Sequence, residues 1–138
     1  AFRVPARSRI ALTPAGVLAD IAPTLLGLAG LPIPADMTGH NIFSDYVDFS
    51  SEVDLLIHDA EYTPEEYPST RGWGHSSYKD ALRLALEANV KLLGLCHHNQ
   101  DRADESIDEI VHHCEEMRDK WKSHASIFAL RSGMEITL

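Results

Sequence analysis

The sequence lacks the features of several large protein classes. Its 138 residues include only 2 cysteines, too few for a disulfide framework, and its apolar runs are short and interrupted. A transmembrane helix needs about 20 consecutive apolar residues, so we predict no membrane span. Basic residues are also scarce, 12 against 21 acidic ones, which gives a formal net charge of -9. This balance disfavours a nucleic-acid surface or an anionic-membrane surface.

Several short catalytic signatures are missing as well. The sequence has no Gly-rich phosphate loop, no G-x-S-x-G and no C-x-x-C, so it predicts no nucleotide loop, nucleophile elbow or dithiol redox site. The first residues lack a long apolar stretch, and we therefore expect no secretory leader. With so few cysteines, this predicts a cytoplasmic protein.

What is present is an ordinary globular composition, 44% apolar and 24% charged. The pattern changes near residues 35–52, which are polar and which we expect to be irregular. Before them, apolar residues at helical spacing predict a helix over residues 18–30, ended by Gly30 and the prolines that follow. We therefore predict two parts, residues 1–45 and residues 46–138.

From residue 53 onward the pattern is that of an α/β protein, because apolar runs alternate with amphipathic stretches. Ser77 and Asp80 form a capping box at the start of one such stretch. The predicted elements are strands over 53–58 and 91–96, helices over 77–88 and 103–122, and a hairpin of short strands over 127–130 and 134–138.

Polar side chains gather where the predicted strands end. His58 and Asp59 end the first strand, His97 and His98 end the second, and His75 precedes the first helix of this part. In α/β proteins, sites lie at the carboxyl ends of strands. Imidazole and carboxylate groups suit Zn, Fe or Mn, and such a metal activates water for hydrolysis. The alternative is that these histidines cap the strand ends and hydrogen-bond to loop carbonyls.

A second group of candidates lies on the long predicted helix. Cys114 falls on its apolar stripe and is predicted to be a core thiol. His112 and His113 flank that stripe and are predicted to be surface groups. A metal pair of Cys96 with Cys114 or His113 is the weaker alternative.

The motifs LLIHDAEYT, RGWGHSS and LCHHNQ, with the ending IFALRSGMEITL, resemble a known family. Over residues 50–138 the sequence is similar to the C-terminal half of metallo-β-lactamase-fold, metal-dependent hydrolases. The resemblance implies an α/β fold, half of an αββα sandwich, in which a mixed sheet carries helices on one face. The N-terminal helix is then an addition to that half-fold.

The resemblance also implies roles for particular residues. His97 matches the family's last metal-binding histidine, His75 matches a proton-transfer histidine, and Asp59 matches the acidic residue that supports it. His98 and His58 stand beside these positions as further candidate metal ligands. The family's main metal motif, H-x-H-x-D-H, and its bridging aspartate are both missing here. The resemblance therefore implies a zinc site that is weak or incomplete.

The upstream segment GVLADIAPTLLGLAGLPIPADMTGHNIF resembles a different family. Over residues 4–43 it is similar to the C-terminal end of cofactor-independent phosphoglycerate mutase. That family's metal ligands and phosphorylated serine lie upstream of the matched part. The resemblance implies a structural helix and tail in this segment.

Two functional hypotheses follow. The first is a non-catalytic folded fragment or chimera of hydrolase-derived segments, with an incomplete metal site. The alternative is a metallo-β-lactamase-fold hydrolase, acting on a phosphodiester or ester, whose remaining metal ligands come from a partner chain. Because half a sandwich leaves an apolar sheet face uncovered, we also predict a homo-oligomer.

Overall fold

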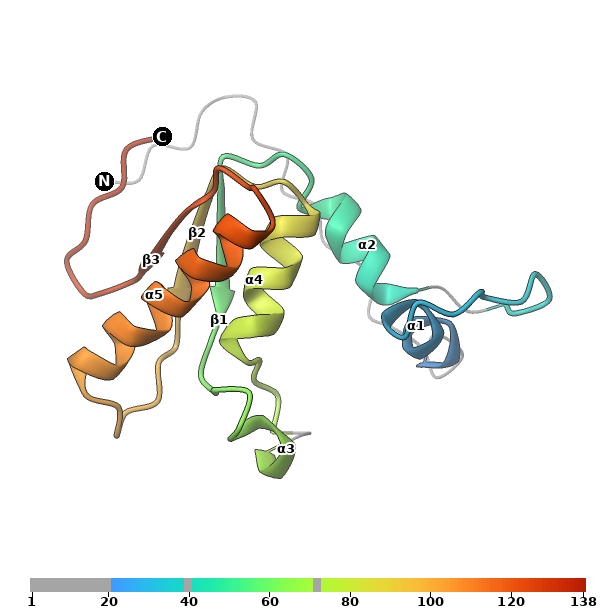
Figure 1. The fold of residues 1–138 in the computed structure, drawn as a ribbon, viewed down its shortest axis with the longest axis horizontal. Coiled ribbons are helices and arrows are strands. Elements are labelled where there is room, and N and C mark those ends of the chain that lie inside the picture. Colours follow the sequence, from blue (N-terminus) through green and yellow to red (C-terminus); the bar gives the residue numbers. More distant parts are fainter. Residues whose placement is uncertain (1–20, 39–40, 71–72) are drawn as a thin grey trace. The chain divides into compact units, whose positions relative to one another are not determined.

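The structure is a computed structural model that describes residues 21–38, 41–70 and 73–138 (Figure 1). The chain divides into two compact units, with the boundary between Phe49 and Ser50. None of the described helices is long and apolar enough to cross a membrane.

The first unit contains the helix α1, Ile21–Leu28. This helix ends at Leu28, and Gly30 just beyond it has a φ of 67°, a left-handed conformation that glycine adopts without strain. The Leu31 N–H then donates to the Leu26 carbonyl at 2.9 Å, which satisfies one of the last helical acceptors. The end of the predicted helix over residues 18–30 is confirmed, and its predicted start lies outside the described residues.

A second helix, α2 (Ile42–Phe49), occupies part of the stretch predicted to be irregular. Its start is fixed by Asn41, whose side-chain oxygen accepts from the Phe43 N–H at 3.1 Å. The Thr24 hydroxyl of α1 accepts from the Ile42 N–H at 2.9 Å and ties the two helices together. The prediction of an irregular 35–52 segment was therefore wrong for residues 42–49, because the capping signal of one asparagine outweighs the mixed polarity of the residues after it.

The second unit is built on a three-stranded parallel sheet. Its strands are β1 (Leu55–Asp59), β2 (Leu92–Cys96) and β3 (Ser126–Ala129), in the spatial order β1-β2-β3. After β1 and after β2, the chain returns to the opposite end of the sheet before the next strand begins, as parallel pairing requires. The predicted α/β class is confirmed.

Two helices cover one face of this sheet, as Figure 1 shows: α4 (Tyr78–Glu87) and α5 (Asp104–Lys120). The predicted capping box opens α4, because the Ser77 hydroxyl accepts from the Asp80 N–H at 3.3 Å and donates to its carboxylate at 2.6 Å. A single-turn helix, α3 (Tyr67–Thr70), lies in the long loop between β1 and α4.

The core lies between the sheet and these helices. Leu82 of α4, Leu93 and Leu95 of β2, and Cys114 of α5 are all fully buried. Burial in these apolar surroundings raises the pKa of Cys114 to about 12, so its thiol is neutral and inert. The predicted core role of Cys114 is confirmed.

The other face of the sheet carries a row formed by Ile57, Gly94 and Phe128, which the strand register places side by side. A Cβ added to Gly94 would lie 3.2 Å from a methyl carbon of Leu130, so the glycine leaves room for that side chain to lie across β2. Ile57 remains 47% exposed. This face is therefore less well covered than the helical face.

The predicted hairpin at the C-terminal end was wrong. β3 pairs parallel with β2, and residues 134–138 form no strand. After β3, the chain makes one more sheet-like bond, from the Leu130 N–H to the Leu95 carbonyl, and then turns at residues 131–134. Apolar alternation alone does not make a strand, since a ladder needs a partner in register. The described sheet is therefore parallel rather than mixed.

Truncating Leu93 tests the position of the core. We expect Leu93→Ala to lower the free energy of unfolding by about 2–5 kcal/mol, because the cavity opens at a fully buried site. The matched change Ile57→Ala removes a half-exposed side chain and should cost less than about half as much. Urea denaturation measures both values, and equal losses would contradict this assignment of the two sheet faces.

Candidate metal and proton-transfer site

The site begins where two neighbouring parallel strands end. Asp59 is the last residue of β1 and pairs in register with Cys96, the last residue of β2. His97 follows immediately and has a φ of 56°, a left-handed conformation that is uncommon for a residue with a Cβ. Three other described non-glycine residues have a positive φ: Glu52, Asn89 and Lys122. Each of them comes shortly after a helix (α2, α4 and α5), whereas His97 follows a strand. The backbone is therefore held in an unusual conformation where the sequence predicted a metal ligand.

His75 comes to the same place through a local pairing of two loop segments. Tyr62 lies just beyond β1, and its N–H donates to the Ser76 carbonyl at 3.2 Å. The Tyr78 N–H in turn donates to the Tyr62 carbonyl at 3.0 Å. These bonds align the start of α4 with the end of β1, so that His75 lies beside Asp59.

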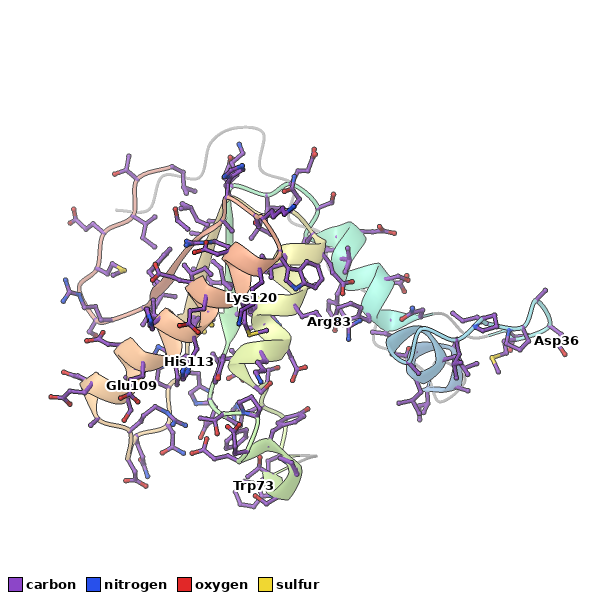
Figure 2. The ribbon with its side chains drawn as sticks, in the orientation of Figure 1. Asp36, Trp73, Arg83, Glu109, His113 and Lys120 are labelled. Atoms are coloured by element: carbon purple, nitrogen blue, oxygen red, sulfur yellow. The ribbon has the colours of Figure 1, made fainter. Side chains whose placement is uncertain are left out.

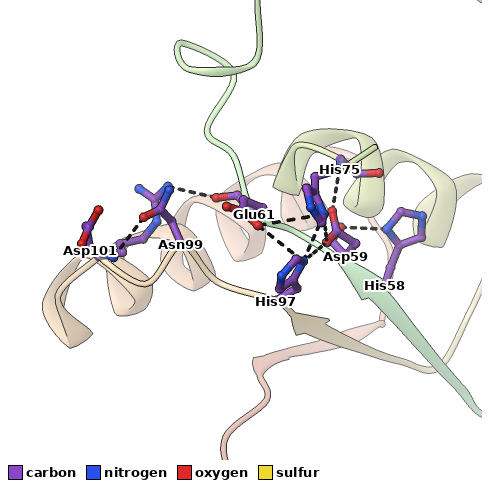
Figure 3. Close-up of polar contacts among 9 residues, drawn as sticks. His58, Asp59, Glu61, His75, His97, Asn99 and Asp101 are labelled. Atoms are coloured by element: carbon purple, nitrogen blue, oxygen red, sulfur yellow. Dashed lines mark hydrogen bonds and ion pairs between the residues drawn. The ribbon is translucent and has the colours of Figure 1, made fainter. Parts of the chain in front are cut away.

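Four side chains from these segments converge, as the close-up in Figure 3 shows. Asp59 Oδ1 lies 3.1 Å from His75 Nδ1 and 2.8 Å from His97 Nδ1, and the two ring nitrogens lie 3.0 Å apart. Glu61 Oε2 lies 3.4 Å from His97 Nδ1 and 3.9 Å from His75 Nδ1. One ligand atom from each of these four residues lies within 4.8 Å of every other.

The carboxylate of Asp59 is the most heavily engaged group of this cluster. Its second oxygen accepts from the Ser76 N–H at 2.5 Å, in addition to the contacts of its first oxygen with the two histidines. Burial by itself raises the pKa of Asp59, but the Ser76 N–H and the two imidazoles outweigh it, and the pKa lies below its usual value. The site therefore favours an ionised carboxylate.

A buried arginine holds the loop that carries Glu61. The side chain of Arg102 is only 10% exposed, and its Nη2 donates to the Glu61 carbonyl at 3.1 Å and to Glu66 Oε2 at 2.7 Å. Glu66 Oε2 also accepts from the Thr63 N–H at 2.7 Å. Burial raises the pKa of Glu66, but the Thr63 N–H and the Arg102 guanidinium lower it by more than burial raises it. The pKa of Glu66 therefore lies below its usual value. The segment after β1 is thus tied to the segment after β2.

The structure brings together three of the five residues singled out in the sequence: Asp59, His75 and His97. His58 lies outside the four-residue cluster, and its Nδ1 lies 2.8 Å from the Asp59 carbonyl, which accepts the hydrogen bond. His58 therefore caps the end of β1, as in the alternative interpretation, but its acceptor is the carbonyl of the strand's last residue and not a loop carbonyl. His98 also lies outside the cluster, and burial lowers its pKa, which favours a neutral ring.

Sequence reasoning missed Glu61. It occupies the position between the H-D-A and Y-T parts of the first motif, and nothing in its spacing distinguishes it from other loop glutamates. The signal that identifies it is the loop pairing around Tyr62, which only the structure shows. His112 and His113 are exposed on α5, as predicted, and Figure 2 labels His113 on that helix near Glu109.

The donor set of the cluster fits a divalent metal of borderline softness. Two imidazole nitrogens and two carboxylate oxygens suit Zn²⁺, Fe²⁺ or Mn²⁺ better than Ca²⁺ or Mg²⁺, which prefer oxygen ligands only. Ligand atoms about 2.1 Å from a tetrahedral zinc lie about 3.4 Å from one another. The N···O separations of 2.8–3.9 Å between the histidine nitrogens and the carboxylate oxygens of the cluster bracket that value.

Comparisons with known proteins agree with this architecture. No protein-family model matches the chain. A structural match joins it to the metallo-β-lactamase fold protein YhfI from Bacillus subtilis, with a TM-score of 0.53 and 21% identity, over 65% of this chain and 32% of that one. The chain carries part of a metallo-β-lactamase fold.

Sequence matches point to one group of relatives. Ribonuclease Z of Saccharolobus solfataricus is 51% identical over 51 residues, which is 37% of this chain and 17% of that protein. Ribonuclease Z of Picrophilus torridus is 39% identical over 57 residues, covering 41% of this chain and 18% of the relative. The chain thus spans less than a fifth of the length of these relatives.

Replacing Asp59 with Asn tests the electrostatics of the site. A carboxylate whose pKa is lower in the folded than in the unfolded state stabilises the fold above its unfolded pKa, near 3.8. That stabilisation is lost as the pH falls through the folded pKa. We expect wild type to be more stable than Asp59→Asn at pH 5–7, with the difference shrinking below about pH 4. Urea denaturation across this range measures it, and a difference independent of pH would refute the assignment.

Proposed function

We propose that residues 50–138 form the C-terminal part of a metal-dependent phosphodiester hydrolase site, and that this chain alone is not catalytic. The convergence of Asp59, His75 and His97 at the carboxyl edge of the sheet carries this proposal. Its further support is the partial sequence match to ribonuclease Z and the match to a metallo-β-lactamase fold. The substrate class is taken from those relatives and belongs to the proposal.

In this function, Asp59 and His75 form a proton-transfer pair. The Nδ1–H of His75 donates to Asp59 Oδ1 at 3.1 Å, which fixes the ring orientation and leaves Nε2 as the atom that holds or releases a proton. The ionised carboxylate stabilises the imidazolium while the proton is held. Nε2 of His75 is then the atom that protonates a leaving group or takes a proton from water.

His97 is the residue that would hold the metal. A divalent ion, when bound, supplies Lewis-acid activation of water and of the phosphoryl oxygens. Catalytic zinc usually has three protein ligands. With Asp59 and His75 committed to the proton, the described cluster leaves His97 and Glu61 for that purpose. The set is one ligand short, which is why we propose that the chain alone does not turn over substrate.

A second candidate is an enzyme completed in trans. In that case another polypeptide brings the remaining ligands, and the described residues supply the proton-transfer pair. The observation that favours it is the intact orientation of Asp59, His75 and His97 around one point. The predicted homo-oligomer remains part of this proposal, and light scattering tests it.

The N-terminal unit has a different role in the proposal. Its resemblance to the end of cofactor-independent phosphoglycerate mutase suggests a segment of separate origin that serves a structural purpose. The described part contributes no residue to the metal and proton-transfer cluster.

Thr24→Ala removes the hydrogen bond between the Thr24 hydroxyl of α1 and the Ile42 N–H of α2. Because this bond lies outside the cluster, we expect a zinc titration to give a metal affinity that is unchanged within about twofold.

The activity of the isolated chain is the direct test. We expect no turnover of a generic bis-phosphodiester above background with added Zn²⁺ or Mn²⁺, because a misplaced or incomplete ligand set loses most of its rate. Robust turnover that His97→Ala abolishes and His124→Ala preserves would overturn the inert-fragment proposal. His124 is an exposed histidine just before β3, at the opposite edge of the sheet, and is the matched control.

A further inference from the structure

We propose that Asp59, Glu61, His75 and His97 bind one divalent ion without help from any other segment, and that Arg102 holds Glu61 in position for it. This single-ion site rests on the proposed function only for the identity of His97 as a ligand. It adds Asp59 and His75 as ligands and Arg102 as a positioning residue. It also predicts that the chain alone binds zinc, which can be measured without any catalytic activity.

The first argument is that protons alone do not satisfy the cluster. Asp59 Oδ1, His75 Nδ1 and His97 Nδ1 form a triangle with edges of 3.1, 2.8 and 3.0 Å. Each ring nitrogen offers either one N–H or one lone pair, and the carboxylate oxygen only accepts. If both rings donate to the oxygen, two N–H groups face each other across the third edge. A central cation instead accepts a lone pair from all three atoms.

The second argument is charge. Asp59 and Glu61 bring two negative charges to a place where the two histidines, when neutral, bring none. Glu61 is only 18% exposed at its side chain and Asp59 25%, so water screens them incompletely. A divalent ion with two carboxylates and two neutral imidazoles gives a neutral, closed set of four ligands. Four protein ligands with no open position are typical of structural rather than catalytic zinc.

The third argument concerns how Glu61 reaches the cluster. Glu61 lies on a loop, where a ligand would normally be mobile. Here Arg102 Nη2 donates to the Glu61 carbonyl, and the same nitrogen is anchored by Glu66. Glu66 is fixed by Thr63, because the Thr63 N–H donates to its carboxylate and the Glu66 N–H donates to the Thr63 hydroxyl at 3.3 Å. The backbone of Glu61 is therefore fixed before any ion binds.

Calorimetric titration of the full chain with Zn²⁺ tests the site. We expect one ion per chain, a rise in Tm on binding, and Ca²⁺ binding at least about 10-fold weaker than Zn²⁺. His97→Ala and Glu61→Gln should each raise the Kd about 10-fold or more, while His124→Ala changes it less than about twofold. No detectable binding at up to about 1 mM Zn²⁺ would overturn the four-ligand site. A zinc affinity that is unchanged in Glu61→Gln would overturn it as well.

A double-mutant cycle tests the role of Arg102. Arg102→Met should weaken zinc binding about as much as Glu61→Gln, and adding it to Glu61→Gln should cost little more, because it acts through that residue. Lys91→Met is the control, since it breaks the 2.6 Å ion pair with Asp54 at the other edge of the sheet and should leave the Kd unchanged. Independent effects that multiply in the double variant would contradict positioning through Glu61.

Milder variants keep this test valid if Arg102→Met unfolds. Glu66→Gln keeps the side-chain shape but removes the charge that anchors the guanidinium, and should weaken zinc binding in the same direction. An unchanged Kd in this variant, at unchanged Tm, would overturn the positioning role. These experiments measure zinc binding and not turnover, so the two proposals can fail separately. An inactive chain that binds no zinc would contradict only the single-ion site. A chain that turns over substrate would contradict only the inert-fragment proposal.

Discussion

The carboxylate of Asp59 joins three segments of the chain that are far apart in sequence. It ends β1, accepts from the backbone of Ser76 before α4, and contacts the imidazole of His97 after β2. Burial works against its charge, yet its pKa lies below the usual value because these partners outweigh burial. Removing the charge would leave the Ser76 N–H and two imidazoles facing a weaker acceptor. The arrangement of the whole edge therefore depends on one ionised oxygen pair.

Parallel pairing explains why these groups meet. In a parallel sheet every strand ends at the same edge, so strand pairing by itself places the residues after β1 and β2 side by side. The helical face beneath is a dense core around Leu93 and Leu95, which fixes the strands and hence the positions of Asp59 and His97. Arg102 then ties the loops beyond the strands together. Rigid strands thus place two of the cluster residues, and the loop pairing and the buried guanidinium place the others.

The sequence predicted the elements that local signals define. Ser77 and Asp80 identified the start of α4, and the buried run of β2 is nearly as predicted. Asp59, His75 and His97 could be named because their types and strand-end positions are informative. Glu61 could not, because its place depends on a bridge between Tyr62 and Ser77 that leaves no periodic pattern. The predicted strand at 134–138 failed for a related reason, since a partner strand is a property of the fold and not of the segment.

The two roles available to His75 exclude each other at one atom. Nδ1 either carries a proton toward Asp59, which orients the ring for proton transfer, or gives its lone pair to an ion. In the first case Nε2 is available for chemistry and the cluster lacks a ligand. In the second the ligand set is closed and no proton-transfer pair remains. The matched region spans less than a fifth of the length of the ribonucleases Z. In the proposed enzyme completed in trans, further donors from another polypeptide would release His75 from the ion. Under our two proposals, the same four side chains therefore form a closed ion site in the chain alone and part of a hydrolase site when completed.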